Sequence, residues 1–184
     1  LLKSKVVSFT IQFIILDNKK KYEFIYKTKY WKNNSIQDSS LSGAGSSLSS
    51  TINIRNELKN FITKKKIKTI TDVPCGDFYW LKEISFIFDQ YFGGDIVDQI
   101  IKDNKKKFIN RNLFFFKIDI LKDNIPESDM FFCRDLIVHL NFDETNLLIS
   151  KLKRLNFKYI ALTHFDDINL NRISNHADNW KKIN

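Results

Sequence analysis

The stretch Thr69-Ile70-Thr71-Asp72-Val73-Pro74-Cys75-Gly76-Asp77-Phe78-Tyr79-Trp80 decides the fold of this chain. Its first five residues form a short β-branched run, which favours a strand. Pro74 and Gly76 then break the run, and residues 78–84 can start a helix. Gly76 lets a ligand approach the backbone closely, and a following helix offers free N–H groups. This order of elements predicts a ligand-binding turn at the end of a strand.

Strand-like and helical patterns alternate after this stretch, which is typical of βαβ units and a largely parallel sheet. We expect strands over 69–73, 90–96, 113–118, 130–133 and 157–162, and helices over 97–108 and 143–155. Residues 48–62 also carry apolar side chains at helical spacing, with Ser46, Ser47 and Ser49 as candidate N-caps. The sequence therefore predicts an α/β fold with a Rossmann-like doubly wound sheet.

Polar residues stand at the ends of the first four expected strands. Ligands of a doubly wound sheet bind outside these carboxyl ends. Asp95, after the second strand, is placed to accept hydrogen bonds from two ribose hydroxyls, and Asp119, after the third, can meet an adenine amino group. The segment 133–140 follows the fourth. The structural alternatives are a turn cap for Asp72, a turn glycine for Gly76, and Asx turns for Asp95 and Asp119.

Together these residues resemble class I S-adenosylmethionine (SAM)-dependent methyltransferases. Residues 72–78 resemble the motif I pattern, acidic-x-Gly-x-Gly-x-Gly, and residues 129–140 resemble motif IV, which borders the methyl group. Asp95 and Asp119-Ile120 match the family positions beside the ribose and the adenine. A narrower resemblance is to bacterial and viral members with three motifs. These are Ser-Gly-x-Gly-Ser, Pro-Cys-Gly-Asp-Phe-x-Trp and Cys-Arg-Asp-x-x-Val-His-Leu, found here at 42–46, 74–80 and 133–140.

The resemblance covers roughly residues 24–184 and implies methyl transfer with SAM as cofactor. Pro74 and Phe78 replace the first and third motif I glycines, as in the narrower group, and G-x-G-x-x-G is absent, which disfavours a dinucleotide fold. The family sheet ends in an antiparallel strand pair, which we expect this chain to lack. The cofactor residues that the resemblance implies are Asp72, Pro74, Cys75, Gly76, Asp77, Trp80, Asp95, Ile96, Asp119, Ile120 and Arg134, with Gly43, Gly45 and Ser46 over the methionine end.

Methyl transfer from SAM depends chiefly on positioning, and a base is needed only if the acceptor has a proton to lose. His139 is the candidate base, because an unperturbed imidazole titrates near neutrality. A core or helix-start histidine is its alternative, and His164 is a second candidate. Arg134 and Asp135 are candidates to orient the acceptor, or they form a simple ion pair.

We expect the chain to divide into an aromatic and basic N-terminal extension (1–41) and a SAM-binding methyltransferase domain (42–184) that is incomplete at its C-terminus. Residues 6–16 are apolar and interrupted by polar residues, which favours a strand or a docking segment. Tyr26 and Trp31 are candidates for the acceptor pocket or for the core. They belong to the aromatic cluster Tyr22, Phe24, Tyr26, Tyr30 and Trp31.

Length and composition suit one domain of 184 residues with 43% hydrophobic content. No stretch is long and apolar enough to span a membrane, so we expect a cytoplasmic protein. Cys75 and Cys133 are expected to be reduced, buried thiols. No cluster offers four ligands for a zinc ion, and we predict no metal.

The net charge of +9 makes nucleic acid a possible partner. This partner is not favoured, because the lysine runs 19–21, 64–66 and 105–107 are scattered along the chain, and such runs are usually solvated loops or helix ends. A small molecule or a sugar is the favoured acceptor. The alternatives are an RNA or protein methyltransferase, which lysines clustered at the mouth of the pocket would support, and an inactive SAM-binding fragment. The oligomeric state is not indicated by the sequence.

Overall fold

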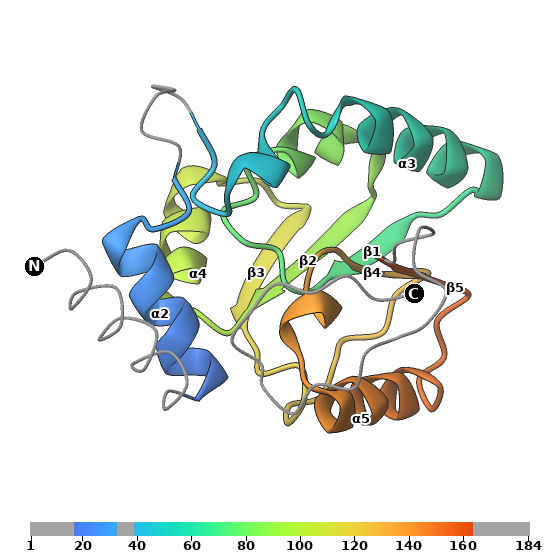
Figure 1. Ribbon diagram of the computed structural model, residues 1–184. Coiled ribbons are helices and arrows are strands. Elements are labelled where there is room, and N and C mark those ends of the chain that lie inside the picture. The colour runs from blue at the N-terminus through green and yellow to red at the C-terminus, as the bar shows by residue number, and fades with distance from the viewer. Residues whose placement is uncertain (1–16, 33–38, 164–184) are drawn as a thin grey trace, which may run out of the picture.

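The sheet has five parallel strands, as a computed structural model describing residues 17–32 and 39–163 shows (Figure 1). The strand order is β3-β2-β1-β4-β5, so the chain reverses its direction of winding between β1 and β4. This order confirms the predicted α/β, Rossmann-like doubly wound fold. The strands are β1 (Thr69–Asp72), β2 (Gln90–Asp95), β3 (Leu113–Lys117), β4 (Met130–Cys133) and β5 (Tyr159–Leu162).

Helices cover both faces of this sheet (Figure 1). They are α2 (Asn18–Thr28), α3 (Ile52–Lys65), α4 (Asp98–Lys107) and α5 (Phe142–Leu152), with short 3₁₀ helices η1 (Ala44–Ser46), η2 (Leu81–Ile87) and η3 (Ile137–His139). The expectation of a sheet without a further antiparallel pair concerns residues 164–184, which lie outside the described residues, as do His164 and the apolar segment 6–16.

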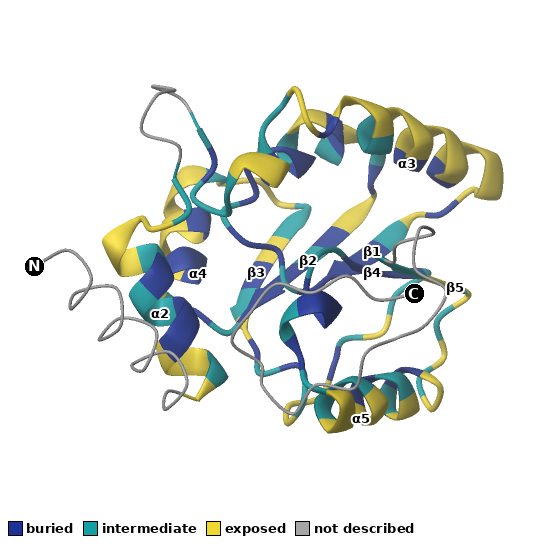
Figure 2. Ribbon diagram, in the orientation of Figure 1, coloured by how far each residue is buried: buried dark blue, intermediate teal, exposed yellow. Residues whose placement is uncertain are grey.

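Two hydrophobic clusters fill the space between the sheet and its helices. Successive side chains of a strand point to opposite faces, and in β4 Met130 and Phe132 belong to one cluster while Phe131 and Cys133 belong to the other. The first cluster includes residues of α3, η2 and α4, and the second includes residues of α5. Figure 2 shows the matching pattern on the helices, whose exposed residues face away from the sheet. Both faces are therefore buried, as expected of a parallel sheet.

The start of α3 differs from the prediction. The N-cap is Thr51, whose side chain makes no capping hydrogen bond, and the serines proposed as caps lie in the turns before it. The Ser47 hydroxyl accepts from the backbone N–H of Ser50 (3.1 Å), while the Thr51 hydroxyl donates back to the Ser47 carbonyl (2.7 Å). The N-cap prediction was wrong because these side chains stabilise the preceding turn instead.

The segment expected to begin a helix at residue 78 forms a 3₁₀ helix that starts later, at Leu81. Phe78 has a φ of +53°, in the left-handed region, so a right-handed helix cannot begin there. Leu81 and Ile84 are both buried and are three residues apart, which matches the period of a 3₁₀ helix.

Helix α2 was not predicted from the sequence. Its N-cap, Asp17, accepts a hydrogen bond from the backbone N–H of Lys20 (2.9 Å). Tyr22 and Ile25 pack against Val97 and Ile100 of the β2–α4 region. Short helices owe most of their stability to such packing, which sequence spacing alone does not show.

One lysine of the run 19–21 is not solvated as expected. Lys21 is only 4% exposed, and its Nζ lies 4.9 Å from the centroid of the Tyr22 ring. The lysines of the other two runs lie at the C-terminal ends of α3 and α4 and are exposed, as predicted.

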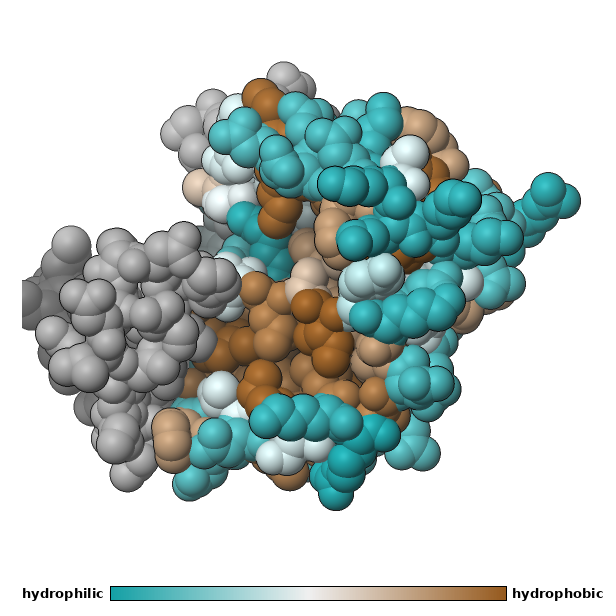
Figure 3. Space-filling model, turned by 90° about the vertical axis from the view of Figure 1, so that its right-hand side faces the viewer, coloured by the Kyte–Doolittle hydropathy of each residue, from teal (hydrophilic) through white to brown (hydrophobic). Residues whose placement is uncertain are grey.

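Figure 3 looks onto the side of the molecule where β5 forms the edge of the sheet, and hydrophobic side chains gather at the centre of this view between hydrophilic ones. Phe61 of α3 and Ile160 of β5 are among the exposed apolar residues.

Within residues 17–32 and 39–163, no helix is long and apolar enough to cross a membrane.

Adjacent leucines of α5 test the described core. Leu148 is fully buried in the second cluster, whereas its neighbour Leu147 is 48% exposed. We expect Leu148→Ala to lower the free energy of unfolding by about 2–5 kcal/mol, because a buried cavity forms. Leu147→Ala should change it by less than about 0.5 kcal/mol. Urea unfolding of both variants measures the difference, and equal losses would contradict this orientation of α5.

Candidate functional site

The carboxyl ends of the strands open into a cavity of about 320 Å³. A cavity of this size suits a small molecule. Every described residue that the sequence analysis proposed for the cofactor, the acceptor or catalysis lines it. These are Tyr26, Trp31, Gly43, Gly45, Ser46, Asp72, Pro74, Cys75, Gly76, Asp77, Trp80, Asp95, Ile96, Asp119, Ile120, Arg134, Asp135 and His139.

The turn after β1 is fixed on both sides of Gly76. The N–H of Gly76 donates to Oδ2 of Asp95 (3.1 Å), and its carbonyl accepts from Nδ2 of Asn104 (2.8 Å). Gly76 has a φ of +54°, and a Cβ at this position would collide with the hydroxyl of Ser42. The glycine is therefore required by its backbone angle and by the close approach of the 39–46 segment.

Asp95 and Asp72 are two buried carboxyl groups beside this turn. Oδ1 of Asp95 accepts from the N–H of Val97 (2.9 Å), and burial raises the pKa of Asp95 to about 6. Oδ2 of Asp72 accepts from the hydroxyl of Tyr91 (2.6 Å), and burial raises the pKa of Asp72 to about 7. Desolvation disfavours the charged form of both acids. A carboxylate has about four acceptor positions, so Asp95 retains acceptor capacity beside its contacts with the backbone of Gly76, Ile96 and Val97.

Asp77 holds the 39–46 segment at the rim of the cavity. Its Oδ2 accepts from the N–H of Leu41 (2.6 Å), and its Oδ1 accepts from the hydroxyls of Ser40 (2.8 Å) and Ser42 (3.3 Å). The Ser42 hydroxyl also lies 2.8 Å from that of Tyr26 in α2. The Asp77 carboxylate thus binds another part of the chain, a role that the sequence did not indicate.

Arg134 makes a second connection to the same segment. Its Nη2 donates to the carbonyl of Gly45 (3.0 Å) and forms an ion pair with Oδ2 of Asp135 (3.2 Å). The guanidinium lies 5.4 Å from the centroid of the Trp80 ring. The ion pair that we considered from the sequence is present, and Arg134 additionally links the end of β4 to the 39–46 segment.

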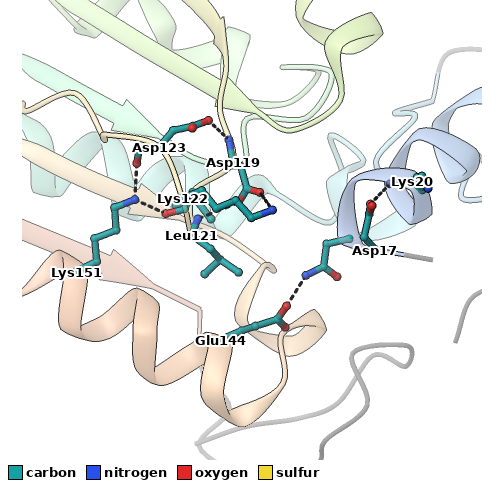
Figure 4. A network of polar contacts seen from close by, with 10 residues as sticks. Asp17, Lys20, Asp119, Leu121, Lys122, Asp123, Glu144 and Lys151 are labelled. Carbon is teal, nitrogen blue, oxygen red and sulfur yellow. Dashed lines mark hydrogen bonds and ion pairs between the residues drawn. The ribbon is translucent and has the colours of Figure 1, made fainter. Parts of the chain in front are cut away.

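The loop after β3 is held by its own Asx turn and by α5 (Figure 4). Oδ1 of Asp119 accepts from the N–H of Leu121 (3.1 Å), and Oδ2 pairs with Lys122 (3.0 Å). Nζ of Lys151 donates to the carbonyls of Ile120 (2.8 Å) and Asp123. The Asx-turn alternative for Asp119 is therefore present, and the turn places Asp119 and Ile120 against the cavity.

His139 lies on η3 among aromatic side chains. Its ring stacks on Trp31 with centroids 5.7 Å apart and meets the edge of Tyr22 at 6.1 Å. Burial, together with the charge of Lys21, lowers the pKa of His139 to about 4. The imidazole is therefore neutral at neutral pH. It has a lone pair to accept a proton or a hydrogen bond, although it is a weaker base than a solvated histidine.

Two residues of α2 that line the cavity, Asn18 and Tyr22, were not predicted from the sequence as site residues. Nδ2 of Asn18 donates to Oε1 of Glu144 (2.7 Å), which connects α2 to the N-terminus of α5. The signal was the four-residue spacing of Asn18, Tyr22 and Tyr26, which puts them on one face of a helix.

The charge of the cavity is opposite to that of the whole chain. Its described lining contains five aspartates and one arginine, and no lysine is among these lining residues. The described lining therefore offers no cluster of lysines to bind phosphate groups.

Solved structures with similar folds include several methyltransferases. The chain is similar to a SAM-dependent methyltransferase from Anabaena variabilis, with a TM-score of 0.59 and 17% identity over 80% of this chain and 61% of that chain. It is also similar to the methyltransferase domain of bacterial CtHen1, with a TM-score of 0.51 and 13% identity over 58% and 62% of the respective chains. These likenesses show that the chain has the fold of SAM-dependent methyltransferases.

A third similar structure is that of magnesium protoporphyrin IX methyltransferase from Synechocystis, with a TM-score of 0.47 and 15% identity over 56% of this chain and 50% of that one. The chain spans 50–62% of the length of these three proteins. No family model matches the chain, and no curated protein matches it.

The raised pKa of Asp72, about 7, gives a pH test of the buried site. An unfolded aspartate titrates near pH 3.9, so the folded chain binds this proton more tightly. The protonated Asp72 therefore contributes to the free energy of unfolding. This contribution is fully present below about pH 4 and is lost as the pH rises to about 7. Asp72→Asn should not show this pH-dependent loss of stability, because the asparagine side chain does not titrate. Between pH 4 and pH 7 the stability of the variant relative to wild type should rise by at most about 1.4 kcal/mol per pH unit.

Urea unfolding of wild type and Asp72→Asn at several pH values measures this trend. A stability difference that stays constant from pH 4 to pH 7 would show that Asp72 is not desolvated as described.

Proposed function

We propose that this chain is a SAM-dependent methyltransferase that acts on a small molecule. The observation that carries the proposal is the convergence of Asp72, Asp95 and Asp119, from the ends of β1, β2 and β3, on one cavity in a methyltransferase-like fold. Ligands of such sheets bind at this edge. SAM, when bound, supplies an activated methyl group for direct transfer.

The groups that line the cavity suit the parts of SAM. Asp95 is assigned to the ribose hydroxyls, because its carboxylate keeps acceptor capacity beside its contacts with the backbone. Apolar side chains of Ile96 and Ile120 line the same cavity and offer surfaces for the adenine, beside Asp119.

The methionine end is assigned to the turn after β1 and to the 39–46 segment. Gly43, Gly45 and Ser46 line the cavity, and Gly45 accepts from Arg134. The hydrogen bonds of Asp77 and Arg134 hold this segment in place before any ligand binds. Such preorganisation reduces the ordering cost of binding.

A small-molecule acceptor is favoured over RNA by the charge of the cavity. Lysines lie at the exposed ends of α3 and α4, whereas the described lining contains five aspartates and one arginine. Phosphate groups would be repelled by these carboxylates.

His139 is assigned to the acceptor side of the cavity. Its neutral imidazole can take up a proton or accept a hydrogen bond, and its contacts with Trp31 and Tyr22 fix the orientation of the ring. The low pKa of about 4 favours positioning over strong base catalysis.

Calorimetric titration with SAM and with S-adenosylhomocysteine tests the cofactor. We expect micromolar binding to wild type and at least tenfold weaker binding to Asp95→Asn, because the amide replaces one acceptor oxygen with a donor. Asp103→Asn is the matched control on α4. Asp103 is exposed and does not line the cavity, so binding should be unchanged.

Thermal unfolding of each variant shows whether it is folded. Failure of the folded wild-type chain to bind either compound would contradict the proposed function. Equal losses in Asp95→Asn and Asp103→Asn would contradict the role of Asp95.

A further inference from the structure

The hydroxyl of Tyr22 is a buried polar group without a hydrogen-bond partner. Tyr22 is 8% exposed, and its oxygen is the one buried side-chain N or O atom in residues 17–32 and 39–163 that lacks a partner. Leaving a buried hydroxyl unpaired is unfavourable. Burial also raises the pKa of Tyr22, so the phenol is neutral and remains a donor.

This hydroxyl belongs to a residue that lines the cavity and lies beside the candidate base. Tyr22, Trp31 and His139 all contribute to the lining, and each ring lies within 6.1 Å of the other two, measured between centroids. Aromatic walls of this kind favour a ligand with a flat apolar face. The neutral imidazole of His139 can donate a hydrogen bond to a hydroxyl group on the same ligand or accept one from it.

Charges of both signs lie near Tyr22, so their effects on a charged ligand oppose one another and favour neither sign. Nζ of Lys21 lies 4.9 Å from the centroid of the Tyr22 ring, and its positive charge opposes a cationic amine. The charges of Asp95 and Glu144 act on Tyr22 with the opposite sign and oppose an anion.

We propose that Tyr22, Trp31 and His139 form the acceptor subsite, and that the subsite binds an uncharged, hydroxyl-bearing ring whose oxygen accepts a hydrogen bond from Tyr22. This inference rests on the proposed methyltransferase function and adds the class of acceptor to it. Phenols and sugars share the required chemistry, since both combine hydroxyl groups with a ring face that packs on aromatic side chains.

The test uses the full chain saturated with S-adenosylhomocysteine and three probes followed by ligand-observed NMR. Catechol represents phenols, methyl β-D-glucopyranoside represents sugars, and benzylamine represents cationic rings. We expect one or both hydroxyl probes to bind, and benzylamine to bind at least tenfold more weakly. Binding of catechol would identify a phenol as the ligand class, and binding of the glucopyranoside would identify a sugar.

Tyr22→Phe removes only the hydroxyl. We expect it to weaken binding of the hydroxyl probe about five- to tenfold, as for the loss of one hydrogen bond. Its melting temperature should equal or exceed that of wild type, because no partner is lost within the described protein. Tyr159→Phe, which changes a β5 residue outside the described lining, is the matched control and should leave probe binding unchanged.

Tyr91→Phe provides a contrast in stability. The Tyr91 hydroxyl donates to Asp72, so this variant should melt at a lower temperature than wild type, unlike Tyr22→Phe. A lower melting temperature for Tyr22→Phe would assign its hydroxyl a structural partner and overturn the proposal.

The remaining outcomes also decide the proposal. Unchanged probe binding by Tyr22→Phe, or no binding of either hydroxyl probe to the wild-type complex, would overturn the subsite while leaving the methyltransferase function intact. Benzylamine binding as tightly as the hydroxyl probes would overturn the uncharged class. Failure to bind S-adenosylhomocysteine would reject the function itself, and the subsite with it.

Discussion

The site depends on the backbone of Gly76 in the turn after β1. Its N–H donates to Asp95 at the end of β2, and its carbonyl accepts from Asn104 of α4. Because the residue has no side chain, Ser42 can approach it closely. A single residue therefore connects two strand ends, one helix and the 39–46 segment. A Cβ here would lie too close to the hydroxyl oxygen of Ser42, so any larger residue would force that side chain to move.

From this turn the 39–46 segment is secured at two places. Asp77 accepts hydrogen bonds from Ser40, Leu41 and Ser42, and Arg134 donates to Gly45. These bonds cross between segments remote in the sequence, so they form only once the sheet is assembled. A cavity wall held in this way is available to a ligand without further ordering, which lowers the entropic cost of binding.

The parts of the site that follow strands were predictable, because strand ends share one edge of a parallel sheet. Asp72, Asp95 and Asp119 could be placed there from periodicity alone. The contribution of α2 was not predictable in the same way. Its contacts with Val97 and Ile100 depend on tertiary packing, and its lysines and aromatic residues give no clear apolar stripe. Tyr22 was therefore noted only as one member of an aromatic cluster.

Positive and negative side chains lie in different parts of the described structure. The lysines of the runs 64–66 and 105–107 stand at or just beyond the C-terminal ends of α3 and α4, where positive charge stabilises the helix dipole. The cavity is instead lined by aspartates, and the buried carboxyl groups of two of them, Asp72 and Asp95, accept hydrogen bonds from Tyr91 and from the backbone respectively. The described cavity lining, with five aspartates and one arginine, therefore does not share the positive net charge of the whole chain, which is +9. The polarity of a ligand that binds here therefore has to be inferred from the cavity and not from the composition of the whole chain.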